Sequence, residues 1–399
     1  MGTAEARFTR HRMKLQLHRS CQLYLRFAQL LFNAPYNLAQ DVHSNSYFKQ
    51  ARCLVSAGIL AWVTICGYRA IAELIEVPMP FFTAVLYVNE VILCVCITVQ
   101  TMVRGYGEAE RYDQFLERIL TVATAVPATE WAKAVLYLRV RLHWLGTTFT
   151  VIFSLGLLLD YLHFGSIGAT LFSLGAYMLP NMLAAMSLAQ YTAGTVLIYK
   201  LQQIVNRQLR TATRKQLRGQ LQTTKHHYLQ LDHCVQLITR SYNVLIVSNV
   251  FAGINVTSLQ LLEIYQYLQA NESKPIYMGY NILWIALQLG MLLMVLCPSD
   301  RTKREQTHFG TILFELSQCN EFTGDDVDQQ IAHLRLLTLN QKRIVPTACG
   351  VLKLELSTLS SIFVALLSFM IILIQFDTSK LNKHGGAVTA LDGLYSAKS

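Results

Sequence analysis

Charged residues are scarce in this chain, and their scarcity excludes an ordinary soluble protein. Only 15% of the 399 residues are Asp, Glu, Lys or Arg, whereas 53% are hydrophobic. Soluble domains carry about 25% charged residues, which cover the surface that faces water. We therefore expect a membrane protein whose surplus apolar surface faces lipid.

Motifs of catalysis and metal binding are also missing. The sequence has no Walker loop, no Gly-x-Ser-x-Gly elbow and no His-Glu-x-x-His pair, so we predict no enzyme activity and no cofactor. The nine cysteines lie in predicted spans or on the predicted inner side, which predicts no structural disulfide. The His226–Cys234 cluster lacks the ligand spacing of a structural zinc site, so we predict no metal. The basic start of the chain lacks the apolar core of a secretory signal.

Seven tracts are long and apolar enough to be membrane-spanning helices. A span needs about 20 mostly apolar residues, because backbone polar groups in lipid must be hydrogen-bonded within the helix. The first tract is short but extends to Ile71, and the second is broken only by Glu90. The predicted fold is an all-α membrane protein with seven transmembrane helices. The tracts are Cys53–Tyr68, Phe81–Val103, Leu142–Leu159, Phe164–Tyr199, Ser241–Leu262, Pro275–Ser299 and Leu356–Phe376.

Lys and Arg are distributed unequally between the two sides of these spans. Roughly 28 of the 34 lie before span 1 or in the connections after spans 2, 4 and 6. Cytoplasmic segments are enriched in these residues, so we predict a cytoplasmic N-terminus and an extracellular C-terminus. Asn271 then forms a candidate glycosylation sequon in an outer loop. The net charge of +10 fits segments near anionic lipid better than it fits nucleic acid binding.

The same patterns divide the chain into segments. An amphipathic pattern over 13–40 predicts a helix that lies on the membrane surface or packs under the bundle. Pro180 is expected to kink the long fourth span, and 326–344 is expected to form a short amphipathic helix. The predicted segments are a cytoplasmic N-terminal segment (1–52), spans 1–6 (53–298) with cytoplasmic helical extensions (200–240), a cytoplasmic segment (299–348), span 7 with its approach (349–376) and an extracellular tail (377–399).

The last span and its approach carry the most specific motif in the chain. Gly350 opens the approach, and Glu355 is an acidic residue just before the span. Ser368-Phe369 is followed by five apolar residues and then by Gln375-Phe376. This pattern resembles the insect gustatory receptor family, whose last span has a Gly-rich entry, an acidic or Asn position, Thr-Tyr, five apolar residues and Gln-Phe. In this sequence Ser and Phe replace Thr and Tyr, which keeps the spacing and removes the phenol hydroxyl.

The resemblance implies a tastant-gated, non-selective cation channel in the plasma membrane of sensory neuron dendrites. It implies a homo- or heterotetramer with other gustatory receptor subunits, in which span 7 of each subunit lines a central pore. It also implies that the outer ends of spans 2–6 enclose a pocket for a small-molecule tastant, and that cytoplasmic helices form a shared anchor. Cations and membrane lipid would be the other partners.

Small polar residues recur along one face of the last span. Ser357, Ser361, Val364, Ser368, Ile372 and Gln375 follow one another at spacings of 4, 3, 4, 4 and 3. Such a stripe can line water, and we predict Ser368, Ile372, Gln375 and Phe376 as pore and gate residues. The alternative is that these side chains hold helices together inside a packed bundle.

A ligand pocket needs aromatic residues and a few placed polar groups near the outer ends of the spans. Tyr280 and Trp284 are the strongest pair, because their i,i+4 spacing places them on one helix face. The same aromatic residues could instead serve packing or the membrane interface. The candidates for ligand binding are Tyr87, Phe153, Tyr177, Glu263, Tyr265, Tyr280, Trp284 and Gln288, and Phe82, Asp160, Phe172 and Gln260 lie nearby in the predicted spans.

Glu90 is the single charged residue of the second span, and such residues are functional candidates by default. It could serve ligand binding or gating, or it could form a buried pair with Arg69.

Two other functions stay open at this point, a metabotropic seven-helix receptor and a membrane transporter. The first would have an extracellular N-terminus, which the charge pattern opposes, and its Asp-Arg-Tyr and Asn-Pro-x-x-Tyr motifs are absent. No internal repeat supports a transporter built on inverted halves.

Overall fold

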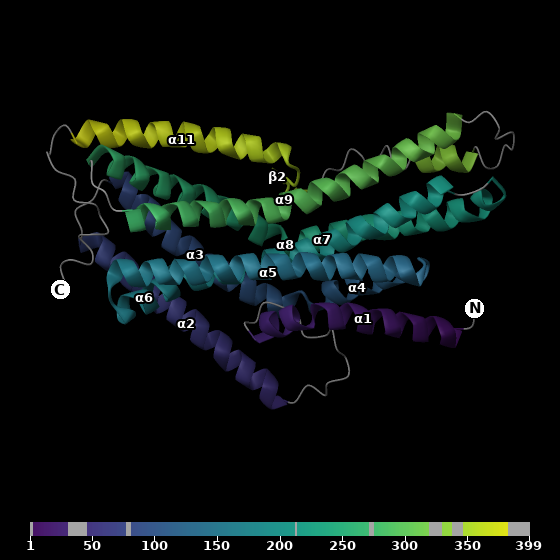
Figure 1. The fold of residues 1–399 in the computed structure, drawn as a ribbon, viewed down its shortest axis with the longest axis horizontal. Coiled ribbons are helices and arrows are strands. Elements are labelled where there is room, and N and C mark those ends of the chain that lie inside the picture. Colours follow the sequence, from purple (N-terminus) through teal and green to yellow (C-terminus); the bar gives the residue numbers. More distant parts are fainter. Residues whose placement is uncertain are drawn as a thin grey trace.

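The structure is a computed structural model, and it describes residues 3–30, 46–76, 81–211, 214–270, 275–318, 329–336 and 346–381. Nearly all of the described chain is helical, and the long helices run side by side along one axis (Figure 1). The elements are α1 (Thr3–Leu30), α2 (Ser46–Glu76), α3 (Phe81–Gly107), α4 (Ala109–Thr124), α5 (Ala128–Phe164), α6 (Ile167–Ser173), the π-helix η1 (Leu174–Met178), α7 (Leu179–Thr211), α8 (Arg214–Ala270), α9 (Pro275–Gln318), β1 (Thr347–Ala348), β2 (Leu352–Lys353) and α11 (Ser357–Leu381), with a further helical segment at 329–336.

Seven of these helices are long and apolar enough to cross a membrane, which confirms the predicted fold class. They overlap the seven tracts that hydropathy identified, and most continue well beyond them. Phe164, the predicted start of the fourth tract, ends the preceding helix, and Leu356 and Phe376 lie just outside the last one. The helices are Cys53–Glu76, Phe81–Gly105, Ala128–Phe164, Ile167–Thr211, Gly219–Gln269, Pro275–Gln318 and Ser357–Gln375. The surface of the bundle has two parts. Apolar side chains cover one half, and charged side chains gather on the other half.

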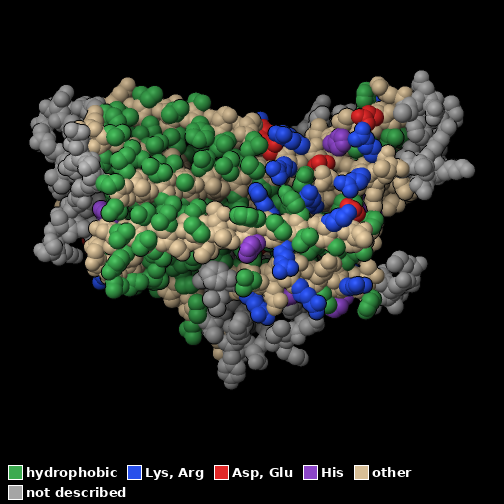
Figure 2. Space-filling view, in the orientation of Figure 1, with side chains coloured by type: hydrophobic (Ala, Val, Ile, Leu, Met, Phe, Trp, Pro, Cys, Tyr) green, Lys and Arg blue, Asp and Glu red, His purple; other side chains and the backbone are tan. Residues whose placement is uncertain are grey.

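Figure 2 shows this division on one face of the molecule. Hydrophobic side chains cover one half of the face, and Lys and Arg side chains gather on the other half. We call these the apolar half and the basic half of the bundle. The helices α1 and α4, the later parts of α7 and α9, and the first part of α8 lie in the basic half (Figure 1). Such a division is what a membrane-spanning bundle with long extensions on one side requires.

α7 is the centre of the bundle. It packs against α3, α5, α8 and α9, and most of its side chains are buried. Its first turn follows the π-helix η1, which ends two residues before Pro180. Proline has no backbone N–H to continue the hydrogen-bonding pattern of an α-helix. The irregular backbone therefore occurs where the sequence predicts a kink, and it turns Tyr177 toward the cavity described below.

α1 packs alongside the bundle and does not lie across its end. It runs along α4 and α5 in the basic half (Figure 1). Leu17 is buried against them, whereas Leu15 and Leu23 of the predicted apolar face are exposed. The predicted helix continued to residue 40, and positions 31–40 lie outside the described residues.

A short β-hairpin precedes the last helix, and the sequence analysis did not foresee it. Thr347 pairs with Lys353 and Ala348 with Leu352. The turn holds Cys349 and Gly350 with φ angles of 52° and 71°. The positive φ at Gly350 explains the glycine of the motif, because glycine adopts this conformation without a steric penalty.

Candidate functional site

A cavity lies in the apolar half, near the ends of the spanning helices that the sequence predicts to be outer. It encloses about 780 Å³ of space, part of it open to the outside. Five spanning helices and the short α6–η1 segment supply its walls. It is lined by Ala70, Glu73, Leu74, Tyr87, Glu90, Asp160, His163, Phe164, Phe172, Ser173, Tyr177, Gln260, Tyr277, Tyr280 and Trp284. We call it the outer pocket.

Aromatic rings form one wall of the outer pocket. The rings of Tyr280 and Trp284 meet edge to face, with their centroids 6.0 Å apart. Tyr277 lies 6.4 Å from Tyr280 and 4.7 Å from the buried ring of Tyr267. These separations are those of interacting aromatic pairs, so the wall is held by its own packing before any ligand binds.

Two buried carboxylates support this wall through hydrogen bonds. Glu263 accepts hydrogen bonds from the hydroxyls of Tyr87 and Tyr277, and Asn281 donates to it over 3.3 Å. Asp160 accepts a hydrogen bond of 2.6 Å from Ser173. Buried polar groups are held in place when they are satisfied in this way, so both carboxylates position neighbouring side chains of the pocket.

Two other polar groups of the pocket have no hydrogen-bond partner among the described residues. Glu90 is 6% exposed, and within the described residues its carboxyl group has no hydrogen bond or ion pair. Arg69, the partner considered from sequence, is exposed and forms no described ion pair with it. The buried Oε1 of Gln260 also lacks a hydrogen-bond partner among the described residues. Both groups line the cavity, and both are hydrogen-bond acceptors.

The structure brings together half of the residues predicted to bind a ligand. Tyr87, Tyr177, Tyr280 and Trp284 line the outer pocket, and Glu263 lies behind its wall. Three others lie elsewhere: Gln288 is buried and donates to Asn181 over 3.0 Å, Phe153 stacks on Phe149, and Tyr265 packs in a cluster that includes residues of α11. Their part in ligand binding stays a prediction, and Asn271 lies outside the described residues.

Sequence reasoning missed the contribution of α2 and, beyond Asp160, of the last turn of α5. Ala70, Glu73 and Leu74 line the pocket from α2, and His163 and Phe164 line it from α5. Tyr277 was also missed, although its i,i+3 spacing from Tyr280 places it on the same face of α9. Glu73 was missed because the hydropathy tract ends before it, at Ile71, whereas α2 continues to Glu76 and leaves Glu73 half-buried.

α11 turns its polar stripe away from the rest of the chain. Ser357, Ser361, Val364, Ser368, Ile372 and Gln375 are all exposed or half-exposed, and Val364 is 65% exposed. Leu366, Met370 and Leu373 are buried in a cluster with Leu259 and Leu262 of α8. At about 100° per residue, the buried set lies roughly opposite the stripe. The described side chains of the stripe therefore face away from the chain's own bundle, and their part in a pore stays a prediction; the side chain of Phe376 is not among them.

An ion pair connects the approach to α11 with α9. Lys303 of α9 donates a hydrogen bond to Glu355, the acidic residue of the motif. This hydrogen bond is the main reason why the pKa of Glu355 lies below its ordinary value, and a second hydrogen bond, with Ser357, lowers the pKa further. The hairpin and the first turn of α11 are thereby tied to the part of α9 that extends beyond the apolar half.

Comparisons with known proteins agree with this architecture. A profile of the 7tm Chemosensory receptor family matches residues 18–380. Gustatory receptor 59f of Drosophila melanogaster is 25% identical over 227 residues, which cover 53% of this chain and 52% of that protein. The chain therefore aligns with about half the length of this relative.

Solved structures of the insect olfactory receptor OR5 from Machilis hrabei share the fold. One superposes with a TM-score of 0.64 at 11% identity and covers 88% of this chain and 96% of OR5. The structure of OR5 in complex with eugenol superposes with a TM-score of 0.58, also at 11% identity, over 93% of this chain and 99% of OR5. With the profile match across most of its length, the chain belongs to the 7tm Chemosensory receptor family.

Proposed function

We propose that this protein is a gustatory receptor that acts as a tastant-gated, non-selective cation channel in chemosensory neurons. In this proposal four subunits, identical or different, surround a pore that their α11 helices line. The outer pocket of each subunit binds the ligand. The N-terminus is cytoplasmic, and the protein lies in the plasma membrane of the dendrite.

The exposed polar stripe of α11 carries the proposal. Three Ser and one Gln lie along this exposed face, and moving hydroxyl and amide groups from water into lipid is unfavourable. The face opposite the stripe already packs on α8. A water-filled pore between α11 helices from several subunits would place the stripe in water, and the apolar Ile372 near Gln375 would suit a constriction that closes by excluding water.

The outer pocket favours a ligand that donates hydrogen bonds and carries a positive charge. Glu90 and Gln260 both present acceptors without described donors, and Asp160 and Glu73 add carboxylates to the lining. The described lining contains no Lys or Arg. Tyr280 and Trp284 present rings, whose faces attract cations. We therefore propose a hydrophobic amine, protonated at neutral pH, as the class of ligand.

A matched pair of compounds tests the channel and its ligand class together. Tryptamine carries an ammonium group where tryptophol, of nearly the same shape, carries a hydroxyl. In excised membrane patches that hold the protein and no added nucleotide or G protein, tryptamine should open a cation current at concentrations at least about tenfold lower than tryptophol. A current evoked by sucrose, with none evoked by tryptamine or tryptophol, would contradict an amine as the ligand class. A response that requires G proteins would contradict the proposed channel function.

A further inference from the structure

A second cavity lies within the bundle and shares no lining residue with the outer pocket. Residues of α1, α3, α4, α5, α7 and α8 line it, and it encloses about 920 Å³ of space, part of it open to the outside. Arg104 on α3 lies in its wall, fourteen residues beyond Glu90 on the same helix, which is about 21 Å along the axis. We call this cavity the inner pocket.

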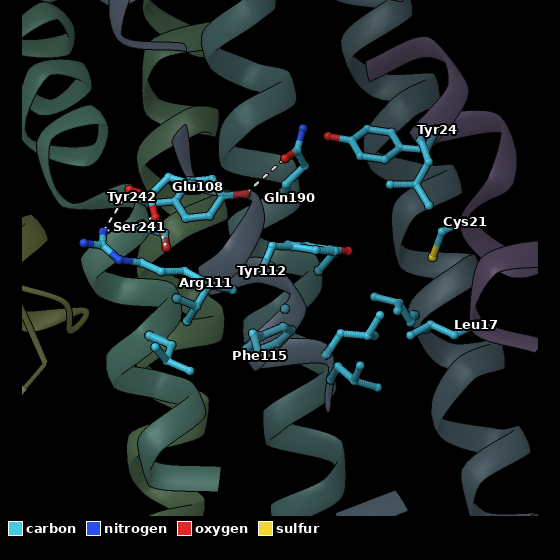
Figure 3. A pocket seen from close by; sticks show the side chains of 18 of the residues that line it. Leu17, Cys21, Tyr24, Glu108, Arg111, Tyr112, Phe115, Gln190, Ser241 and Tyr242 are labelled. Carbon is cyan, nitrogen blue, oxygen red and sulfur yellow. Dashed lines mark hydrogen bonds and ion pairs between the residues drawn. The ribbon is translucent and has the colours of Figure 1, made fainter. Parts of the chain in front are cut away.

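The walls of the inner pocket are mainly apolar, and α1 and α4 supply two facing walls. Figure 3 shows Leu17, Cys21 and Tyr24 of α1 on one side of the cavity, across from Tyr112 and Phe115 of α4. α1 therefore closes a space that the spanning helices leave open. Leu17 is 7% exposed and Phe115 is 7% exposed, so these walls are packed from behind. A cavity with such walls suits a hydrocarbon chain.

One end of the inner pocket is polar and carries a net positive charge. The lining holds two guanidinium groups, Arg104 and Arg111, and one carboxylate, Glu108, which leaves one positive charge. Arg111 pairs with Glu108 over 2.8 Å, and Ser241 donates to Glu108 over 2.8 Å. Arg104 is only 8% exposed. An anion at this end would meet a buried guanidinium, which binds oxygen anions with paired hydrogen bonds.

The position of Arg104 is fixed by neutral groups of the same end. It donates to Oε1 of Gln190 over 3.1 Å and to Oγ of Ser187 over 3.5 Å, and it lies 4.1 Å from the ring centre of Tyr242. Tyr242 donates to the same oxygen of Gln190 over 3.1 Å (Figure 3). The guanidinium group is thus already oriented toward a defined place before a ligand binds.

The inner pocket lies where the apolar half meets the basic half. Leu138 and Leu142 of α5 line it, and they flank the exposed Arg139 and Arg141 on the same helix. This is the depth of lipid headgroups in a membrane-spanning bundle, where basic pockets between helices bind anionic lipids. We propose that the inner pocket binds an anionic amphiphile, with an acyl chain between α1 and α4 and an acidic headgroup at Arg104.

Photolabelling of the full-length protein tests the proposal. The protein is placed in phosphatidylcholine nanodiscs with an oleic acid analogue that carries a diazirine on its chain, and the labelled peptides are mapped after irradiation. Label should appear in segments 17–25, 112–116 or 237–242, and unlabelled oleate should remove it. Label confined to the exposed outer faces of α2 and α5 would overturn the proposal, because it would report ordinary surrounding lipid.

Three variants separate binding from general contact with lipid. Arg104→Gln removes the charge and Ala193→Phe fills the cavity, and each should lower labelling about tenfold or more. Arg139→Gln makes the same charge change on an exposed residue outside the lining and should leave labelling unchanged. If Arg104→Gln does not fold, Ala193→Phe decides alone. Unchanged labelling in the folded variants would overturn the proposal.

Competition identifies the headgroup and its source. Phosphatidylserine added to the nanodiscs should reduce labelling if the occupant is a membrane phospholipid. If the occupant is a free fatty acid, oleate should reduce labelling and phosphatidylserine should not. Either result supports an acidic headgroup. Equal competition by oleyl alcohol, which has the same chain without the acid, would overturn it.

Discussion

Glu90 places a carboxyl group inside a cavity whose nearest wall is aromatic. Its neighbours Asp160 and Glu263 are held by hydrogen bonds from Ser173, Tyr87 and Tyr277, whereas Glu90 has no described donor. Burying a carboxyl group without a partner is unfavourable, so a ligand that supplies a donor gains the most at this residue. The sequence indicated Glu90 as a candidate because it is charged within a span. Which carboxylates are already satisfied could not be predicted, because Tyr87 and Glu263 are 176 residues apart.

Replacement of Glu90 by Gln is predicted to weaken the response to an amine selectively. A charge-assisted hydrogen bond contributes about 1.5–3 kcal/mol, so the concentration of tryptamine for half-maximal current should rise about 10- to 100-fold. The smaller response to tryptophol should change little, since a hydroxyl gains less from a carboxylate. Dose–response currents in patches measure both. Glu110→Gln, the same change on an exposed residue of α4, is the control. An equal shift for both compounds would argue against a contact between Glu90 and the ammonium group.

The helices were predictable from sequence because lipid imposes one simple rule on them. Hydropathy placed the start of the second span at Phe81 and of the sixth at Pro275, where the structure has them. The hairpin before α11 was not predictable, since two-residue strands show no period. Likewise, the sequence suggested that the amide of Gln288 binds a ligand, and only the fold shows that this amide donates a hydrogen bond to Asn181. The ion pair between Lys303 and Glu355 is another contact that joins elements far apart in sequence.

The ion pair between the hairpin approach and α9 should make stability depend on pH. The pKa of Glu355 is lowered in the folded protein, chiefly by the hydrogen bond from Lys303. A lowered pKa means that the stabilisation is complete above the ordinary value of 4.5 and is lost as the pH falls through the lowered pKa. Glu355→Gln should therefore lower the thermal midpoint at pH 7, and the difference from the parent protein should shrink below about pH 4.5.

Thermal unfolding of the purified protein over a pH series measures this difference. Glu315→Gln, an exposed position on α9, serves as the control and should show no such dependence. If the difference between the parent protein and Glu355→Gln stayed constant down to acidic pH, the pair would not contribute through charge.

At the scale of the whole molecule, α11 is attached to the bundle by one face only among the described contacts. It lies along one edge of the bundle (Figure 1) and packs on α8 through Leu366, Met370 and Leu373. The polar stripe was visible in sequence, but whether it faced the chain's own core or outward was not, because both arrangements give the same period. The outward orientation is the finding that makes an assembly around a shared pore the best account of this helix.

The most direct test of this account is the accessibility of the stripe to a charged thiol reagent. Ser361 and Phe363 are both exposed and two residues apart, so they lie about 160° from each other around α11. Each is changed to Cys, and the reagent is applied to tryptamine-activated patches, with the parent protein as control for its native cysteines. Ser361→Cys should lose most of its current on modification while the channel is open, whereas Phe363→Cys should respond like the parent. Equal effects at both positions, or none at Ser361→Cys, would contradict a pore lined by this face of α11.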